Sequence, residues 1–130
     1  MKVLIGAALA FATTVAIAAE GEWVTVAVPS DGDVISVGSG SIRQQPGGYT
    51  TFWLKTTYRE PKRPTPISKR LMTYVVAKVE LHCEREEMRV VDATFYDADD
   101  DVVSSSAGSK THAIYPETIG DQLQRHVCKR

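Results

Sequence analysis

The sequence predicts an α+β protein: a single antiparallel β-sheet of about six strands, with a C-terminal helix packed on it and one disulfide. Three observations lead to this fold class. Stretches in which apolar and polar residues alternate are joined by mostly short turn sequences, which favours antiparallel strands. Near the C-terminus, apolar residues instead recur at helical spacing. The two cysteines, Cys83 and Cys128, stand at the ends of a predicted strand and of the predicted helix.

The beginning of the chain has the pattern of a secretory signal peptide. Lys2 supplies a positive charge, a largely apolar stretch follows, and small residues suit cleavage after Ala18 or Ala19. We therefore expect a signal peptide over residues 1–19 and a single exported domain over residues 20–130. No cysteine follows the cleavage site, so the expected location is the periplasm, the medium or the cell surface, without a lipoprotein anchor.

The charge and cysteine content narrow the class of protein further. The 130-residue chain has a formal net charge of −1, which gives no overall field for nucleic acid or an anionic membrane. We expect a protein partner of unknown identity, no nucleic acid and no membrane span. Two cysteines in an exported chain of this size indicate a disulfide.

Two strands are predicted first. Residues 22–28 alternate, with Val24, Val26 and Val28 on one face. The sequence PSDG then has the composition of a turn, because proline fixes φ and glycine accepts a positive φ. Residues 33–44 predict the second strand, bent or bulged at the sequence GSGS.

A third strand and a proline-rich loop follow. Residues 49–58 predict a long strand, whose Trp53 or Tyr58, if exposed, would add an aromatic anchor for a partner. Residues 59–68 hold three prolines in six positions, which predicts an exposed loop because proline cannot donate to a sheet ladder. With its flanks this loop carries five cations and one acid. A positive protein-binding surface and a solvated linker are equally good interpretations. The candidate binding residues are Arg59, Lys62, Arg63, Lys69 and Arg70.

Residues 74–83 predict the central strand. Every odd-numbered residue from Val75 to Cys83 is apolar, while lysine, glutamate and histidine alternate with them, as in a strand with one buried face. Cys83 should therefore point into the core beside Leu81.

Two more strands complete the predicted sheet. Residues 88–98 predict a strand with Val91, Ala93 and Phe95 on one face, and residues 102–106 a shorter edge strand.

The acidic sequence DADDD between these strands has partial calcium-loop spacing. Asp97, Asp99 and Asp101 alternate, but Val102 and Gly108 stand where an EF-hand needs glycine and a bidentate acid. A solvated acidic turn is the better interpretation. The histidines lack zinc-ligand spacing, the serines lack a nucleophile elbow, and no motif places a carboxylate pair as acid and base. We expect no catalytic residues, no metal and no cofactor.

The C-terminal helix explains the second cysteine. Ile119, Leu123 and Val127 form one apolar stripe, and a helix this short must pack on the sheet to be stable. A Cys83–Cys128 disulfide would tie helix to strand and, in the entropic model, remove on the order of 4 kcal/mol of unfolded-chain freedom.

Several of these features together match a known family. Trp23 opens the domain and Trp53 lies in a middle strand; LHCEREEMR and FYDADDDVV follow, and IYPETIGDQLQRHVC ends on the second cysteine. On these features the chain resembles the surface-adhesin protein E family over nearly all of residues 22–128. The resemblance implies a six-stranded antiparallel sheet covered by a helix, and a non-enzymatic surface protein that forms dimers and binds host matrix and plasma proteins such as vitronectin and laminin.

The resemblance has two limits. The family's adhesin is lipid-anchored, whereas this signal region ends without the required cysteine. The family motif fixes cysteines and aromatic residues rather than ligand contacts, so no binding residue is carried over.

We therefore expect a non-enzymatic exported bacterial protein that acts as an adhesin E-like binding module for protein partners. The alternative is a periplasmic envelope protein that inhibits an enzyme such as lysozyme, a role that suits small disulfide-bonded β domains.

Overall fold

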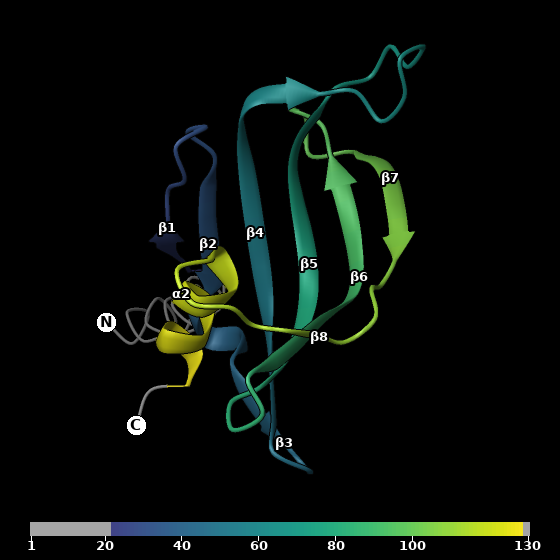
Figure 1. Cartoon of the computed structure of the whole chain (residues 1–130). Helices are drawn as coiled ribbons and strands as arrows, with labels where there is room; N and C mark the ends of the chain where they lie inside the picture. Colours follow the sequence, from purple (N-terminus) through teal and green to yellow (C-terminus); the bar gives the residue numbers. More distant parts are fainter. Residues whose placement is uncertain (1–21, 129–130) are drawn as a thin grey trace, which may run out of the picture.

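One antiparallel sheet with a terminal helix on one face forms the part of the chain that the structure describes, residues 22–128 of a computed structural model (Figure 1). The strands are β1 (Trp23–Ala27), β2 (Val34–Gly38), β3 (Arg43–Gln45), β4 (Tyr49–Lys62), β5 (Met72–His82), β6 (Glu87–Tyr96), β7 (Val102–Ala107) and β8 (His112–Ala113). The described helices are the 3-10 helix η2 (Ser39–Ser41) and the α-helix α2 (Ile119–Val127). The predicted signal peptide lies outside the described residues.

The strand order confirms the predicted fold class. Six strands lie side by side in the order β1-β2-β4-β5-β6-β7, and every pairing is antiparallel. Two short strands add to this path, since β3 pairs with β4 and β8 pairs with β6. The predicted strand over residues 33–44 is divided by η2 into β2 and β3, because the GSGS sequence makes a tight helical turn there.

The predicted proline loop is shorter than expected. Strand β4 continues to Lys62 and includes Pro61, so the exposed loop begins at Arg63. The ladder between β4 and β5 is interrupted from Thr57 to Lys62, and β2 pairs with β4 only as far as Thr57. Pro61 therefore removes no ladder hydrogen bond, which is why a strand accepts it.

A bulge in β1 corrects the predicted face of its valines. The register with β2 shifts between Thr25 and Ala27, so one extra residue is inserted in β1. As a result Ala27 is buried and Val28 is 61% exposed. The prediction that the alternation from Val24 to Val28 runs without interruption, with all three valines on one face, was therefore wrong.

A second bulge changes the predicted face of β6. Lys78 pairs with Asp92 but the next residue, Val79, pairs with Val90, which leaves Val91 as the extra residue. Met88 and Val90 face the core on one side of the bulge, and Ala93 and Phe95 on the other. The prediction that Val91 shares a face with Ala93 and Phe95 was wrong, because the extra residue interrupts the alternation.

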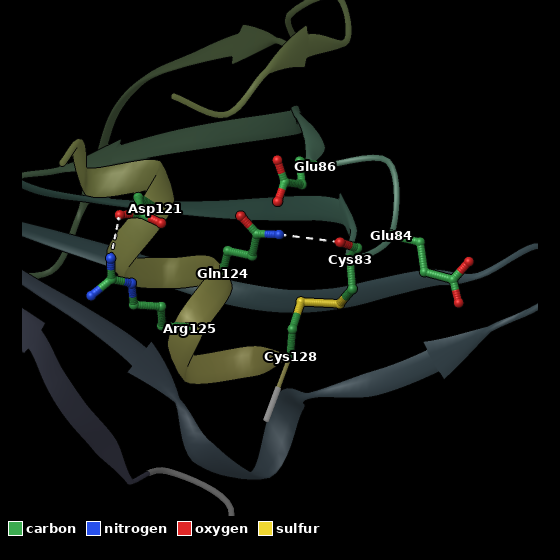
Figure 2. A pocket seen from close by; sticks show the side chains of 7 residues that line it. All are labelled: Cys83, Glu84, Glu86, Asp121, Gln124, Arg125 and Cys128. Atoms are coloured by element: carbon green, nitrogen blue, oxygen red, sulfur yellow. Dashed lines mark hydrogen bonds and ion pairs between the residues drawn. A yellow bond between two sulfur atoms is a disulfide. The ribbon is translucent and has the colours of Figure 1, made fainter. Parts of the chain in front are cut away.

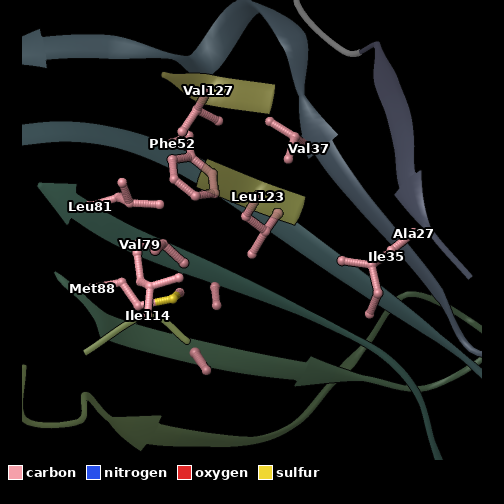
Figure 3. Close-up of a cluster of buried hydrophobic side chains, with 12 residues drawn as sticks. Ala27, Ile35, Val37, Phe52, Val79, Leu81, Met88, Ile114, Leu123 and Val127 are labelled. Carbon is pink, nitrogen blue, oxygen red and sulfur yellow. The ribbon is translucent and has the colours of Figure 1, made fainter. Parts of the chain in front are cut away.

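The core lies between the sheet and the helix (Figure 3). Phe52 from β4, Val79 and Leu81 from β5, and Leu123 from α2 are at most 1% exposed. This confirms the inner face predicted for residues 74–83 and the packing of Leu123 and Val127 on the sheet. Ile119, predicted to belong to the same apolar stripe, is instead 38% exposed at the start of the helix. At about 25 cal/mol per Å² of buried apolar surface, side chains of this size each contribute roughly 1.5–3 kcal/mol. We call the side of the sheet that packs against α2 the covered face and the opposite side the outer face.

The segment between β7 and α2 crosses the covered face on the same side as the helix (Figure 1). Its Ile114 is buried in the core, and the amide of Ile114 donates to the Glu86 carbonyl. Helix α2 starts after Thr118, whose hydroxyl accepts a hydrogen bond from the Asp121 amide. Because Thr118 is the N-cap, Pro116 lies two residues before it and outside the helix.

Candidate functional site

The disulfide lies beside a polar hollow of about 520 Å³ where the helix ends against the sheet (Figure 2). The Gln124 amide donates to the Cys83 carbonyl at 3.1 Å, and Arg125 forms an ion pair with Asp121 at 3.1 Å. Both cysteines are bonded, so neither supplies a thiolate. The disulfide and the Gln124 hydrogen bond join the helix end to the residue that follows β5. The cluster around Cys128 is therefore a structural clamp.

The proline loop projects past the end of the β4–β5 hairpin (Figure 1). Lys62 lies at the end of β4, with its ammonium 5.0 Å from the centre of the Tyr58 ring. The Arg63 guanidinium donates to the Ser68 carbonyl at 2.5 Å, which closes the loop on itself. Lys69 is exposed next to this contact.

The other two candidate cations contact separate turns. Arg59 lies against the β1–β2 turn: its amide donates to Asp33, and its side chain occupies the space that a side chain on Gly32 would need. The Arg70 guanidinium binds Asp97 in the β6–β7 turn at 2.7 Å. Of the predicted set, Lys62, Arg63 and Lys69 thus lie in the loop between β4 and β5 or at its start, while Arg59 and Arg70 contact two neighbouring turns.

An exposed apolar side chain, which the sequence pattern did not single out, lies on the same loop as these cations. Ile67 is 90% exposed, the highest value among the exposed large hydrophobic residues, and Leu71 at the other end of the loop is 39% exposed. The sequence did contain a sign of this exposed residue: an isoleucine stands between Pro66 and Ser68 in a segment predicted to be an exposed loop. We call Lys62, Arg63, Ile67 and Lys69 the hairpin tip.

The acidic turn uses its carboxylates to hold itself together. Asp97 accepts hydrogen bonds from the amides of Asp99 and Asp101 at 2.9 and 3.0 Å. The hydrogen bond from Arg70, followed by that from the Asp101 amide, lowers the pKa of the Asp97 carboxyl. Within residues 22–128, no group of three histidine, cysteine, aspartate or glutamate side chains is arranged to hold a metal ion.

Aromatic side chains gather on the outer face of the sheet. The rings of Tyr74 and Tyr96 stack with centroids 4.9 Å apart, and the Lys55 ammonium lies 4.6 Å from the Tyr74 ring and 5.6 Å from that of Trp23. Tyr74 also donates to Asp100 at 2.7 Å. Burial and then this hydrogen bond raise the pKa of Tyr74 to about 12.

Trp53 belongs to the same outer face and is 42% exposed. It alternates along β4 with the buried Phe52, which settles the face that the sequence left open. In the described part of the chain, no helix is long and apolar enough to cross a membrane.

Comparisons with known proteins agree with this architecture. The family model described as surface-adhesin protein E matches residues 23–129. A crystal form II structure of Haemophilus influenzae protein E aligns with a TM-score of 0.62 at 17% identity, covering 82% of this chain and 86% of that one. Protein E from non-typeable Haemophilus influenzae aligns with a TM-score of 0.54 at 20% identity, covering 84% and 85%. At these identities the structures establish a shared fold. No curated protein sequence matches the chain.

Proposed function

Because the chain belongs to the surface-adhesin protein E family, we propose that it is a non-enzymatic, exported binding module for a protein partner. The family description and the shared fold of protein E support a surface adhesin-like role. The proposal includes the signal peptide over residues 1–19, which would deliver the domain outside the cytoplasm. The comparisons lend no support to the enzyme-inhibitor alternative.

The observation that carries the proposal is the exposure of Ile67 at the hairpin tip. An isoleucine that is 90% exposed loses its contact with water only if another molecule covers it. Interfaces commonly place such an apolar anchor at their centre, with a polar rim around it. Here the polar neighbours are cationic, since Arg63 binds the Ser68 carbonyl next to Ile67, Lys69 follows Ser68, and Lys62 ends the strand that leads into the loop. We therefore propose a partner with an apolar pocket bordered by acidic side chains.

The hairpin tip is held in one shape before it meets a partner. The Arg63 contact with the Ser68 carbonyl closes the loop, the Ser68 amide donates to the Thr65 carbonyl at 3.1 Å, and the Ser68 hydroxyl donates to the Arg70 carbonyl at 3.2 Å. Prolines restrict the backbone between these contacts. A loop that is already ordered loses less conformational entropy when it binds, which raises affinity.

The test uses the two partners that the family resemblance implies. Purified protein is passed over immobilised vitronectin and laminin, and binding is measured by surface plasmon resonance at two salt concentrations. We expect Ile67→Ser to weaken capture by roughly tenfold. The double variant Lys62→Ala/Lys69→Ala should weaken capture mainly at low salt, because salt screens charge attraction.

Matched controls separate the hairpin tip from the rest of the surface. Val102→Ser changes another exposed apolar residue, 55% exposed in β7, and Lys110→Ala removes an exposed lysine elsewhere. Both should bind normally. If Ile67→Ser and Lys62→Ala/Lys69→Ala both bind as well as the parent protein, the hairpin tip is not the binding surface. If neither vitronectin nor laminin binds the parent protein, these matrix and plasma proteins are not its ligands. Lysozyme activity in the presence of the protein should be unchanged; inhibition would restore the alternative.

A further inference from the structure

Trp53 lines two hollows on the outer face of the sheet. The larger, about 550 Å³, lies toward β6 and β7. The smaller, about 220 Å³, lies toward η2 and β3. The polar residues of the larger hollow are Asp92, Thr94, Tyr96, Ser105 and Ser106. Those of the smaller hollow are Ser41, Arg43, Gln45, Thr51 and Lys78.

The small side chains of β7 keep the larger hollow open. Ser105 pairs with Thr94 and Ala107 pairs with Asp92, so serine and alanine stand where larger residues would fill the space beside the indole ring. A volume of about 550 Å³ lies within the range of about 300–1,000 Å³ typical of small-molecule sites. The space therefore suits one or two sugar-sized rings.

Polar groups beside the ring have unused hydrogen-bonding capacity. Trp53 pairs with Lys78, and Lys78 with Asp92, across neighbouring strands. Among the described residues, the side chains of Trp53, Lys78 and Asp92 form no hydrogen bond, and the lysine and the aspartate form no ion pair within 4.0 Å. The indole N–H and the ammonium are free donors, and the carboxylate is a free acceptor. The hydroxyls of Thr94, Ser105 and Ser106 in the larger hollow can both donate and accept.

This combination fits the chemistry of a pyranose. One face of a pyranose ring presents C–H groups that stack on the negative face of an indole, while its edge carries hydroxyls that need both donors and acceptors. Two cations, Arg43 and Lys78, and one anion, Asp92, line the hollows, but the Arg43 guanidinium already donates to the Gly40 and Ile42 carbonyls. The charged groups left free beside Trp53 are therefore one cation and one anion, which favours a ligand without net charge. We propose that Trp53 and its two hollows form a binding site for a neutral oligosaccharide, with one sugar stacked on the indole and another in the neighbouring hollow.

A second copy of the chain fits this face less well. A symmetric interface centred on Trp53 would bring two copies each of Lys78 and Asp92 out of water at its centre, and interface cores are depleted of such charges. The saccharide site is also separate from the hairpin tip, so the two proposals can fail independently.

The chain's two tryptophans allow a direct test in the full protein. Trp23→Phe leaves Trp53 as the sole indole, and Trp53→Phe leaves Trp23. Each variant is titrated with cellotriose, triacetylchitotriose and maltotriose while tryptophan fluorescence is recorded. At least one trisaccharide should change the emission of the Trp23→Phe protein in a saturable way, and the Trp53→Phe protein should show no change in the emission of Trp23.

Variants with an independent readout complete the test. By calorimetry, Trp53→Ala should lower the affinity for that trisaccharide at least about tenfold. Trp23→Ala is the matched control, because Trp23 is 37% exposed but lines neither hollow, and it should bind normally. Ser105→Leu fills the larger hollow with Trp53 intact, and it should also abolish binding even if Trp53→Ala folds poorly. Ile67→Ser should have no effect.

Three results would overturn the proposal: no response to any of the three trisaccharides, undiminished affinity in both Trp53→Ala and Ser105→Leu, or a dimer by sedimentation that Trp53→Ala dissociates while no trisaccharide binds. The last result would assign the outer face to a second copy of the chain.

Discussion

Cys83 and Cys128 are joined by a disulfide that closes a separation of 45 residues, with their Cα atoms 5.9 Å apart. The bond fixes the end of α2 to the position just after β5. It lies at the border of the core, against which both cysteines pack half-buried. The helix contributes Leu123 and Val127 to that core, so the covalent tie and the hydrophobic contact act on the same element.

Removing the disulfide should destabilise the domain. The double variant Cys83→Ala/Cys128→Ala should lose about 2–4 kcal/mol of unfolding free energy, because the unfolded chain regains the freedom of a long loop. Urea denaturation of the variant and the parent protein measures the difference. A thiol titration supports it: free thiols should appear only after reduction. Equal urea midpoints would show that packing of the helix alone holds the C-terminus.

Gly108 should not tolerate a side chain. A Cβ at this position would overlap the carbonyls of Val90 and Val91, at the bulge of β6. Because backbone atoms cannot move aside as a flexible side chain does, we expect Gly108→Ala to cost on the order of 1–3 kcal/mol in thermal or urea unfolding. Gly120→Ala is the control: its Cβ would meet the flexible Met88 sulfur, and helix propensity favours alanine, so its effect should be much smaller. Equal effects would argue against the close approach.

The start of α2 depends on one hydroxyl. Thr118→Ala removes the acceptor of the Asp121 amide and should cost about 1 kcal/mol of stability, whereas Thr118→Ser keeps the acceptor and should cost little. Chemical denaturation of the two variants measures the difference. If serine and alanine were equally destabilising, the methyl group rather than the cap would be responsible.

Tyr74 should titrate late at alkaline pH. Burial and the Asp100 hydrogen bond raise its pKa to about 12, compared with about 10 for an ordinary tyrosine. A raised pKa in the folded state contributes stability below about pH 10, and this contribution is lost as the pH rises toward 12. Ultraviolet titration should show one tyrosine that ionises at a higher pH than an ordinary phenol. This ionisation should be missing in Tyr74→Phe and should occur at a lower pH in Asp100→Asn. A titration unchanged by Tyr74→Phe would assign the late phenol to another tyrosine.

The Arg70 contact with Asp97 predicts a change at acidic pH. In Arg70→Ala, the pKa of the Asp97 carboxyl should rise toward its ordinary value but stay below it, because the Asp99 and Asp101 amides still donate to this carboxylate. In the parent protein the lowered pKa contributes stability above the ordinary value, and this is lost as the pH falls through the folded-state value. Carbon NMR of the side-chain carboxyls measures the shift. Arg63→Ala, which loses only the Ser68 contact, should leave the Asp97 carboxyl unchanged.

Residue periodicity was sufficient to predict the central strands. The alternation over residues 74–83 correctly gave the buried row that includes Val79 and Leu81, because a long strand between two others keeps its pleat. The same rule failed for Val28 and Val91, where a bulge inserts one residue. His82 also departs from the rule: it is 7% exposed because Gly47 and Gly48 fold over it, with its ring hydrogen-bonded to the Gly47 carbonyl.

The candidate surfaces were harder to predict. The sequence marked the proline loop by composition, but it did not reveal that Arg59 and Arg70 contact neighbouring turns while Ile67 stands free at the tip. It named Trp53 without assigning it to a face. The hollows beside Trp53 depend on the register of β5, β6 and β7, which brings Lys78, Asp92 and Ala107 into one row. Register is a relation between strands, so no single segment contains it.

The sequence alone determined the number of main strands, the terminal helix and the pairing of its two cysteines. These follow from local periodicity and from having one possible cysteine partner. The tertiary structure decided where the alternation is interrupted, which cations remain at the hairpin tip and what lies beside Trp53. Those features arise where segments distant in the sequence meet. One example is Gly108, whose backbone lies against the Val90 and Val91 carbonyls at the β6 bulge and leaves no room for a side chain.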